Sequence, residues 1–420
     1  MTVTDTLNLS YYWEFPSNQR LRLLYLLLIS VSIVSLFLRG ALTYSPHQTQ
    51  NREGWGPTTS LLDEHSSLQA VENRTLGFQN VLCINLPSRT DKRDAITLGS
   101  SVTDFHVDWI EGVSAEDMDL KAYPPHYGEP GRPIMIPGEV GNWRAHLNAM
   151  RRIVSDRLTT ALIIEDDSDW DVTLKIQLHE FALASQSLQK ARKVKAPKIF
   201  RHRTPNTAPN SPYGDEWGIL WLGHCGMTCR QDAPYYKRSN DSTALPVDSL
   251  PPYWSGRASP NTRIICQTRY VICTGAYAVS YNAAQKIIAA LSVLPSDEIF
   301  PPGTSSIFDV SLGRLCENGY LTCYSSFPSL IGNWRPAGSP SRNSDIQIVQ
   351  NSEGEYQEAV SSGIAQSTML NLDKLLEGTH GTDPAIHHSV APEANLYDKR
   401  PHLGGGLYVL DNDTMIERKV

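Results

Sequence analysis

Residues 161–167 read ALIIEDD, a short apolar run that ends abruptly in three acids. A run of this length and composition is typical of a strand buried in a parallel sheet. Open α/β sheets bind their ligands just beyond the carboxyl ends of such strands, so we expect Glu165, Asp166 and Asp167 to face a crevice. Clustered carboxylates repel one another, and oxygen ligands suit Mg²⁺ or Mn²⁺. The stretch predicts a divalent-cation site, with a helix cap or a solvated turn as the alternative.

The elements around this strand follow an α/β order. Residues 81–86 and 105–110 are apolar runs that predict two further strands. From 140 to 158, apolar residues recur every three or four positions, which is the signature of an amphipathic helix. Strand, strand, helix and strand in this order indicate parallel pairing. Farther along, residues 218–222 predict a strand, and residues 270–280 predict a strand pair or one bent strand.

Basic residues follow the first predicted strand at once. Arg89, Lys92 and Arg93 lie just beyond its carboxyl end, where positive groups suit a nucleotide or a phosphate. Asp91 can cap a helix that begins at this point. An ordinary charged helix start explains the same residues equally well on local grounds.

Three further residues are candidates for chemistry. Glu139 precedes the amphipathic helix in a glycine-flanked turn, and His146 lies at the edge of the apolar face of that helix. Asp309 stands ahead of a later apolar helix and could be a carboxylate that reaches the crevice. Capping explains Glu139 and Asp309 as simply, and a packed, hydrogen-bonded side chain explains His146.

The N-terminal part predicts a membrane anchor. Residues 23–38 carry no charge and are flanked by arginines, and snorkelling arginines extend a run that is slightly short for a bilayer. We expect an uncleaved anchor at 21–39 after a cytosolic tail at 1–20, with a signal peptide as the alternative. The arginine bias places the N-terminus in the cytosol. The chain beyond a polar stem at 40–75 would then be lumenal.

Cysteine content agrees with that compartment. Seven cysteines allow up to three disulfides with one thiol left over, and Cys83, inside an apolar strand, is the expected free and buried one. A zinc cluster of His224, Cys225 and Cys229 is the less favoured alternative, because the spacing fits no four-ligand pattern well. The net charge of −7 and the pI near 6.0 give no reason to expect a nucleic acid as a partner.

Three motifs occur in a fixed order: INLPSRTDKR at 84–93, GEVG at 138–141 with His146 after it, and IEDD at 164–167. Together they resemble glycosyltransferase family 25, the type that glycosylates lipopolysaccharide and collagen. The anchor and the long proline- and serine-rich loops look like a fungal branch of that family. The resemblance covers residues from about 76 to 335, which is most of the predicted lumenal part.

The resemblance implies a GT-A-like fold, a nucleotide-binding α/β sandwich with a mixed, mainly parallel sheet. It implies a divalent metal, Mn²⁺ or Mg²⁺, a UDP-sugar donor that is commonly UDP-galactose, and inversion at the anomeric carbon. Relatives commonly carry a cysteine where this chain has Asn142 and a serine where it has Ala145. These departures bear on acceptor contacts.

Roles at the strand end follow from strand alternation. Alternation puts Glu165 and Asp167 on one face as metal ligands, and Asp166 on the other face, toward ribose or backbone, unless a turn exchanges these roles. The resemblance completes the set of residues that we expect to bind the donor. These are Asn85, Arg89, Asp91, Arg93 and Asp166.

An inverting transfer also needs a base that takes the proton of the acceptor hydroxyl. Asp309 is our first candidate for this base and Glu139 is our second. His146 is the third residue predicted to act in catalysis or substrate contact.

The sequence thus predicts a UDP-sugar-dependent glycosyltransferase, anchored in the membrane of the Golgi or endoplasmic reticulum, that acts on a glycan or glycoprotein. Its catalytic domain is expected at 76–345, followed by a flexible, partly docked segment at 346–420. Two alternatives come from other classes. One is a non-catalytic lumenal protein that keeps the fold for binding or assembly. The other is a glycoside hydrolase, which needs two carboxylates but neither adjacent acids nor a metal.

Overall fold

The computed structural model describes residues 68–195, 210–245, 261–339, 342–346, 355–378, 406–411 and 416–419. The predicted cytosolic tail, the anchor at 21–39 and most of the predicted stem lie outside these ranges. Within these ranges, no helix is both long and apolar enough to cross a membrane.

Six strands form the centre of a larger mixed sheet. In spatial order they are β10 (Cys323–Phe327), β5 (Ile219–Gly223), β9 (Ala276–Ser280), β3 (Thr160–Glu165), β1 (Asn80–Asn85) and β2 (Asp108–Glu111). β1 pairs in parallel with both β2 and β3, and β5 pairs in parallel with β10. β9 runs antiparallel between β3 and β5, so five of the six strands point the same way. The mainly parallel centre fits the expected GT-A-like sheet.

Antiparallel strands extend the sheet beyond β10, and the sequence predicted only residues 270–272 of this part as strand. They are β8 (Arg263–Ile272), β7 (Tyr235–Arg238), β13 (Gly406–Asp411) and β14 (Ile416–Lys419), with β6 (Gly226–Cys229) paired to β8. Residues 270–280 belong to two separate strands, because the loop 273–275 lies between β8 and β9. A smaller sheet holds β12 (Val360–Ser362), β11 (Ile331–Arg335) and β4 (Ser168–Trp170).

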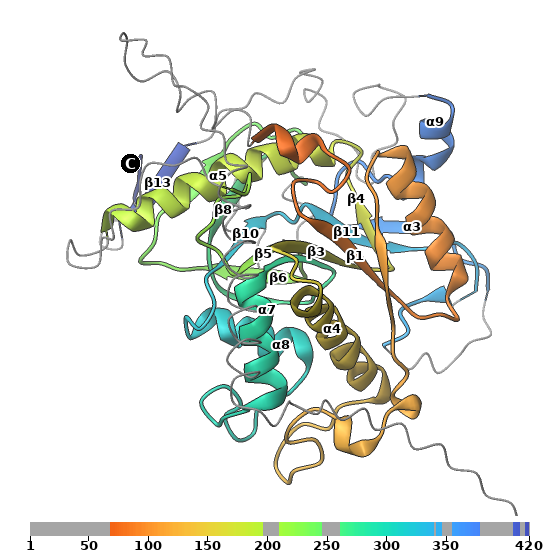
Figure 1. The fold of residues 1–420 in the computed structure, drawn as a ribbon. Coiled ribbons are helices and arrows are strands. Elements are labelled where there is room, and N and C mark those ends of the chain that lie inside the picture. The colour runs from red at the N-terminus through yellow and green to blue at the C-terminus, as the bar shows by residue number, and fades with distance from the viewer. Residues whose placement is uncertain are drawn as a thin grey trace, which may run out of the picture. The chain divides into compact units, whose positions relative to one another are not determined.

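Helices cover both faces of the central sheet (Figure 1). One face carries α4 (Pro137–Ser155), α7 (Tyr281–Ile288) and α8 (Phe308–Glu317), and the other carries α3 (Thr90–Val102) and α5 (Leu174–Lys195). In β1, Leu82 and Ile84 pack with the first group, and Val81 and Cys83 pack with the second. Burial on both faces explains why these strands read as continuous apolar runs.

Short helical segments complete the described part of the chain. They are η1 (Ala70–Glu72), η2 (Ala115–Asp117), η3 (Leu120–Ala122), the π-helical η6 (Ala289–Val293), η8 (Met369–Asn371) and the short helix α9 (Leu372–Leu376).

The boundaries of α4 follow from its sequence. Pro137 stands at the first helical position, where a missing N–H costs little. Glu139 Oε2 accepts a hydrogen bond from the backbone N–H of Ile136 at 2.9 Å, which caps the helix. Trp143 and Met150 are buried against the sheet, and burying such a side chain stabilises a fold by about 1.5–3 kcal/mol. The predicted amphipathic helix is confirmed, about three residues nearer the N-terminus than the apolar pattern indicated.

Three disulfides join six of the seven cysteines. The pairs are Cys225–Cys273, Cys229–Cys266 and Cys316–Cys323. Cys83 is free and buried, as predicted. The alternative of a zinc cluster that includes Cys225 and Cys229 is wrong, because both thiols are consumed in disulfides.

Segments at both ends of the described chain pack onto the core. Val71 of η1 is buried. The packed core therefore includes residues that precede position 76, where the catalytic domain was predicted to begin. Toward the C-terminus, Asp169 accepts a hydrogen bond from the backbone N–H of Met369 at 3.2 Å, and Asp171 accepts one from Gln366 at 2.9 Å. Two buried acids beside β4 therefore hold the segment 355–378 in place.

Candidate active site

A pocket of about 260 Å³ opens at the carboxyl ends of β1 and β3. From β1 the chain crosses through α3 to β2 on one side, and it then returns through α4 to β3 on the other side. The position between β1 and β3 is therefore a topological switch point, where open α/β sheets bind ligands. We call it the carboxylate pocket. Its polar lining residues are Lys92, Ser114, Glu116, Asn142, Glu165, Asp166, Asp167, Ser344 and Asp345.

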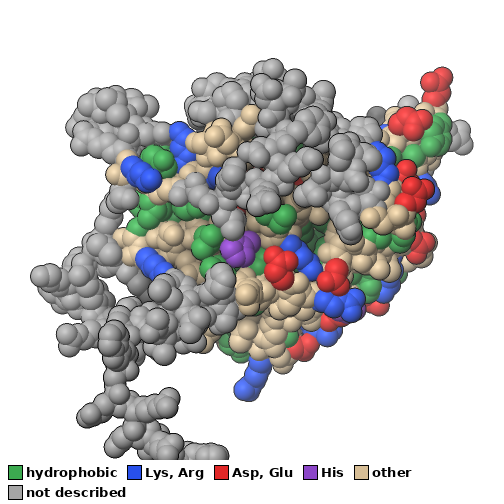
Figure 2. Space-filling view, turned by 90° about the horizontal axis from the view of Figure 1, so that it is seen from above, with side chains coloured by type: hydrophobic (Ala, Val, Ile, Leu, Met, Phe, Trp, Pro, Cys, Tyr) green, Lys and Arg blue, Asp and Glu red, His purple; other side chains and the backbone are tan. Residues whose placement is uncertain are grey.

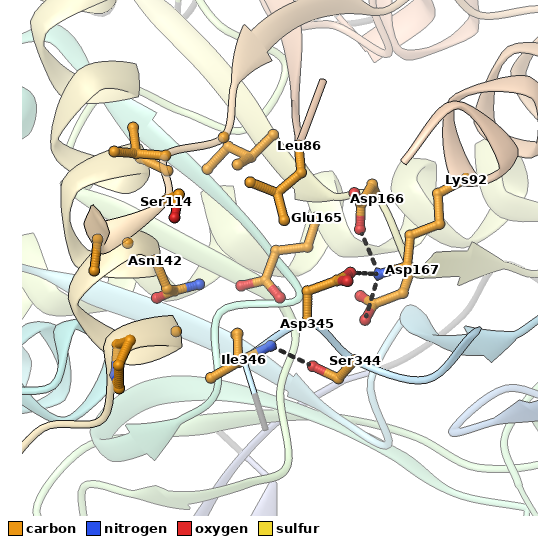
Figure 3. Close-up of a pocket in the computed structure, with 18 of the residues that line it drawn as sticks. Leu86, Lys92, Ser114, Asn142, Glu165, Asp166, Asp167, Ser344, Asp345 and Ile346 are labelled. Carbon is orange, nitrogen blue, oxygen red and sulfur yellow. Dashed lines mark hydrogen bonds and ion pairs between the residues drawn. The ribbon is translucent and has the colours of Figure 1, made fainter. Parts of the chain in front are cut away.

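All three acids of the ALIIEDD stretch line the carboxylate pocket (Figure 3). Glu165 is the last residue of β3, and Asp166 and Asp167 form the turn that leads into β4. The backbone N–H of Trp334 donates to Asp167 O at 2.7 Å and holds this turn. Because the strand ends at Glu165, simple alternation does not apply, and Asp166 shares the pocket with its neighbours.

Lys92 supplies the positive charge at the centre of these acids. Its Nζ lies 2.8 Å from Asp166 Oδ1, 3.7 Å from Asp167 Oδ2 and 3.2 Å from Asp345 Oδ2 (Figure 3). The side chain is only 3% exposed. Burial lowers the pKa of Lys92, but the carboxylates of Asp167 and Asp166 outweigh burial and raise it to about 12. Lys92 is therefore charged at neutral pH.

Asp166 is bound on both carboxylate oxygens. Lys92 Nζ contacts Oδ1, and Asn85 Nδ2 donates to Oδ2 at 2.9 Å. Asn85 Nδ2 also donates to the backbone carbonyl of Arg89 at 3.0 Å, which ties the end of β1 to the start of α3. Burial nevertheless raises the pKa of Asp166, against the effects of Lys92 and Asn85.

Asp167 carries the least compensated charge of the three acids. Burial raises its pKa most, Lys92 lowers it, and the carboxylates of Glu165 and Asp166 raise it further, to about 7. Its side chain is 22% exposed toward the pocket. A carboxylate in this condition is well suited to receive a cation.

Glu165 is hydrogen-bonded through one oxygen. Its Oε1 accepts from Thr274 Oγ1 at 2.8 Å and from His146 Nε2 at 3.1 Å. Burial raises the pKa of Glu165, but the bonds from His146 and Thr274 outweigh burial and lower it below its ordinary value. Glu165 is therefore an ionised carboxylate at neutral pH.

Arg89 joins the pocket to the segment 342–346. Its guanidinium bonds Asp91 Oδ2 at 2.9 Å and also bonds the carboxylate of Asp345. The bond to Arg89 and the field of the guanidinium hold the pKa of Asp91 below its usual value against the effect of burial. Asp345 thus contacts both Arg89 and Lys92, the two cations nearest the acids.

Four residues predicted for the site have other partners. Arg93 stacks on the ring of Trp109 at 4.5 Å, and Glu139 caps α4. Asp309 Oδ2 accepts from the backbone N–H of Cys273 at 2.8 Å. His146 lies behind Glu165 and is fully buried. Of the predicted site residues, only the three acids line the pocket. Asn85, Arg89 and Asp91 stand beside it, since Asn85 bonds Asp166, and Arg89 bonds Asp345 and Asp91.

Sequence reasoning missed three contributors to this site. Lys92 was recognised as basic but not as the partner of the acids, and Thr274 and Asp345 were not considered. Thr274 contacts Glu165 across 109 positions, and Arg89 and Asp345 are separated by 256. Local patterns do not contain contacts of this range. The position of Lys92 two residues after the helix start was the one available signal.

The acids suit a divalent metal by their chemistry. Glu165 and Asp167 offer carboxylate oxygens, and the raised pKa of Asp167 marks negative charge that Lys92 does not fully offset. Within the described ranges, no group of three or more His, Cys, Asp or Glu side chains could hold a metal ion by itself. Mg²⁺ and similar ions are commonly bound by one or two carboxylates together with substrate phosphates. Such a site is completed only when its ligand arrives.

The face of the described chain that is seen from above carries mixed charge. Acidic and basic side chains lie next to one another on its described part (Figure 2). This agrees with the modest net charge of −7 and offers no extended basic track for a polyanion.

Comparisons with known proteins point to one class of enzyme. No protein-family model matches the chain. The chain is 22% identical over 284 residues to procollagen galactosyltransferase 2 of Mus musculus and of Homo sapiens, which is 65% of this chain and 38% of each relative. It is 25% identical over 248 residues to procollagen galactosyltransferase 1 of Danio rerio, 56% of this chain and 33% of that relative. The chain thus matches less than two fifths of the length of these relatives. It is similar to glycosyltransferases.

Proposed function

We propose that this chain transfers galactose from UDP-galactose to a hydroxyl of a glycan or glycoprotein, with inversion and with help from a divalent metal. The observation that carries the proposal is the carboxylate pocket itself. Three acids and Lys92 meet there at a switch point of the sheet, and Arg89 contacts the lining residue Asp345. The relatives named galactosyltransferases support the sugar and the acceptor class, and the motifs at 84–93, 138–141 and 164–167 support family 25.

In this proposal Arg89 and Lys92 bind the diphosphate of the donor. Both now bond Asp345, so an entering diphosphate replaces that carboxylate on the same two cations. Asn85 and Asp91 act behind them, since Asn85 holds Asp166 and Asp91 holds Arg89. Arg93 stays a prediction for the donor site, with Trp109 as its present partner.

The nucleoside fits the opposite part of the pocket. Residues 112–116 and the start of α4 line this part, and its polar groups are Asn142, Ser114 and Glu116. Figure 3 shows Asn142 and Ser114 there. Gly141 allows α4 to approach this loop closely, because an added Cβ would stand 2.1 Å from Val113 O.

Glu165 and Asp167 would hold the metal, assigned as Mn²⁺ or Mg²⁺. A bound metal would neutralise the charge that grows on the departing diphosphate. Lys92 contributes to the same neutralisation and lowers the pKa of Asp166 against the effect of burial. Asp166 in turn fixes the position of the Lys92 ammonium.

The group that takes the proton of the acceptor hydroxyl remains assigned by prediction, with Asp309 first and Glu139 second. Asp309 accepts a hydrogen bond from the backbone N–H of Cys273, and Glu139 accepts one from that of Ile136. Catalytic bonds often form only in the complex with substrate.

We also propose that the chain works in the lumen of the Golgi or endoplasmic reticulum as a single-pass membrane protein. Three disulfides support an oxidising compartment. The proposed anchor at 21–39 rests on the sequence alone.

Donor preference and metal dependence test the proposal. UDP release by the purified full chain is measured with UDP-galactose, UDP-glucose and UDP-N-acetylglucosamine, before and after EDTA treatment. We expect release from UDP-galactose, its loss in EDTA and its recovery with Mn²⁺. UDP release that EDTA leaves unchanged would contradict the proposed metal dependence. A lack of UDP release from all three donors would contradict the proposed transferase activity.

A further inference from the structure

A buried polar cluster holds Glu165 from behind, on the side away from the carboxylate pocket. Thr274 Oγ1 donates to Glu165 Oε1 at 2.8 Å, and His146 Nε2 lies 3.1 Å from the same oxygen. His146 Nδ1 lies 2.8 Å from the hydroxyl of Tyr277. Thr274 is 4% exposed, and His146 and Tyr277 are fully buried. We call Thr274, His146 and Tyr277 the support cluster.

Hydrogen-bond directions in the support cluster follow from the acceptor at its end. An ionised carboxylate only accepts, so His146 Nε2 carries the proton that Glu165 Oε1 receives. In a neutral ring Nδ1 then accepts, and the Tyr277 hydroxyl is its donor. One tautomer of His146 therefore satisfies the chain from Tyr277 to Glu165.

Packing fixes the imidazole in that orientation. Phe308, the first residue of α8, stacks on the ring of His146 with centroids 4.7 Å apart and planes 10° from parallel. His146 itself is placed by α4 and Tyr277 by β9. Three elements from distant parts of the chain thus hold one ring.

Several contacts hold the loop that carries Thr274. Cys273 is joined to Cys225 by a disulfide, and its backbone N–H donates to Asp309 Oδ2 at 2.8 Å. Gly275 O accepts from the backbone N–H of Glu165 at 3.0 Å. Cys273 has a φ of +66°, a conformation that non-glycine residues adopt only when their surroundings impose it. Asp309 therefore has a structural partner in this loop.

The two carboxylate oxygens of Glu165 therefore have different surroundings. Oε1 receives both bonds from the support cluster. In the described part of the chain, no hydrogen bond to Oε2 is found, and Glu165 lines the pocket. Figure 3 shows its carboxylate reaching into the space between Asn142 and Asp345.

We propose that Thr274, and Tyr277 acting through His146, are positioning residues that turn Glu165 so that Oε2 faces the cation and diphosphate of the donor. This inference rests on the proposed function for the identity of the ligand. Partners of metal-binding carboxylates in other proteins typically change metal affinity by 10–100-fold when they are removed.

Mn²⁺ affinity in the presence of UDP is the first readout, measured by electron paramagnetic resonance on the full chain. Thr274→Val and Tyr277→Phe should each weaken Mn²⁺ binding by about tenfold. Thr274→Ser keeps the hydroxyl and should restore the affinity of the wild type. Tyr213→Phe is the matched control, because Tyr213 is equally buried and donates to Leu76 O in the other core. Equal affinities for Thr274→Val and Thr274→Ser would overturn the proposal.

A second readout needs neither metal nor donor. Imidazole ¹⁵N shifts, assigned to His146 by comparison with His146→Gln, report which nitrogen carries the proton. The wild type should show the Nε2–H tautomer, and Tyr277→Phe should shift the tautomer ratio. A proton on Nδ1 in the wild type would overturn the arrangement. If the wild type shows the Nε2–H form but transfers no sugar, the proposed function fails while the support cluster stands.

Discussion

At the scale of single residues, Lys92 is the side chain on which the site depends most. It is buried, stays charged, and contacts Asp166, Asp167 and Asp345 together. Removing one partner of a buried ion pair leaves the other charge without compensation, which costs about 3–5 kcal/mol. The acids were evident in the sequence, but the cation that makes their clustering tolerable was not.

Lys92→Met should therefore lower the free energy of unfolding by about 3 kcal/mol and abolish UDP binding. Adding Asp166→Asn should recover most of the stability but none of the affinity for UDP, because the diphosphate still lacks its cation. Urea unfolding and titration calorimetry measure the two effects. The exposed lysine Lys286 of α7 provides the control Lys286→Met. UDP affinity that survives Lys92→Met would contradict the assignment.

His224 gives the fold a local dependence on pH. Its Nε2–H donates to Ser326 O at 2.9 Å, and burial lowers its pKa from 6.5 to about 4. Between these two values the unfolded chain binds one proton more than the folded chain, so stability falls as pH falls.

His224→Gln removes this titration. Between pH 7 and pH 5, the wild type should lose roughly 2 kcal/mol more stability than the variant. Buried acids with raised pKa, such as Asp169 at about 6, act in the opposite direction, but they are common to both proteins and cancel in the comparison. Chemical denaturation at the two pH values measures the difference. Equal losses of stability in the wild type and in the variant would show that His224 is protonated at pH 5 in the folded state as well, which would contradict the lowered pKa.

At the scale of elements, the turn after β3 and the close approach of α4 shape the pocket. The sequence predicted β3 and α4 from their apolar patterns, and both are observed. It left open a turn at the strand end, but it did not predict that this turn leads into β4, a strand of a second sheet. That turn brings all three acids to one pocket, where strand alternation would separate them.

A substitution at Gly141 tests whether the pocket requires α4 to lie close to the loop at residues 112–116. In Gly141→Ala the new Cβ would stand 2.1 Å from Val113 O, so α4 or the loop must move. We expect a net loss of about 1–2 kcal/mol, since overpacking costs about 1–3 kcal/mol and alanine returns up to about 1 kcal/mol of helix propensity. UDP affinity should fall as well.

Gly99→Ala in α3 is the matched control for this helix substitution. Its nearest neighbour is the flexible end of the Met369 side chain, 2.9 Å from the added Cβ. Urea unfolding and UDP titration compare the two variants. If both lose the same stability and both keep UDP binding, the close contact between α4 and the loop has no role in the pocket.

At the scale of the whole molecule, the fold consists of two helical layers on a mainly parallel centre, extended by antiparallel strands. The centre was predictable because strands buried on both faces leave continuous apolar runs in the sequence. The extension through β8, β7 and β13 was predicted only at residues 270–272, since its strands pair residues far apart along the chain. The same distance hid Thr274 and Asp345 from prediction.

Cysteine pairing shows the same limit. Seven cysteines and one apolar strand were enough to predict three disulfides and a free Cys83. Two of the pairs depend on β6 lying beside β8, and the third joins α8 to β10. Counting cysteines cannot reveal this pairing.

The central claim is that the acids after β3 bind a metal and a nucleotide sugar for transfer. Its most direct test is Mn²⁺-dependent UDP release from UDP-galactose by the full chain carrying Asp167→Asn. We predict a loss of about a hundredfold or more against the wild type, because stabilisation of the departing diphosphate is removed. Asp94→Asn, an exposed change on α3, should keep the rate of the wild type. An unchanged rate in Asp167→Asn would contradict the account.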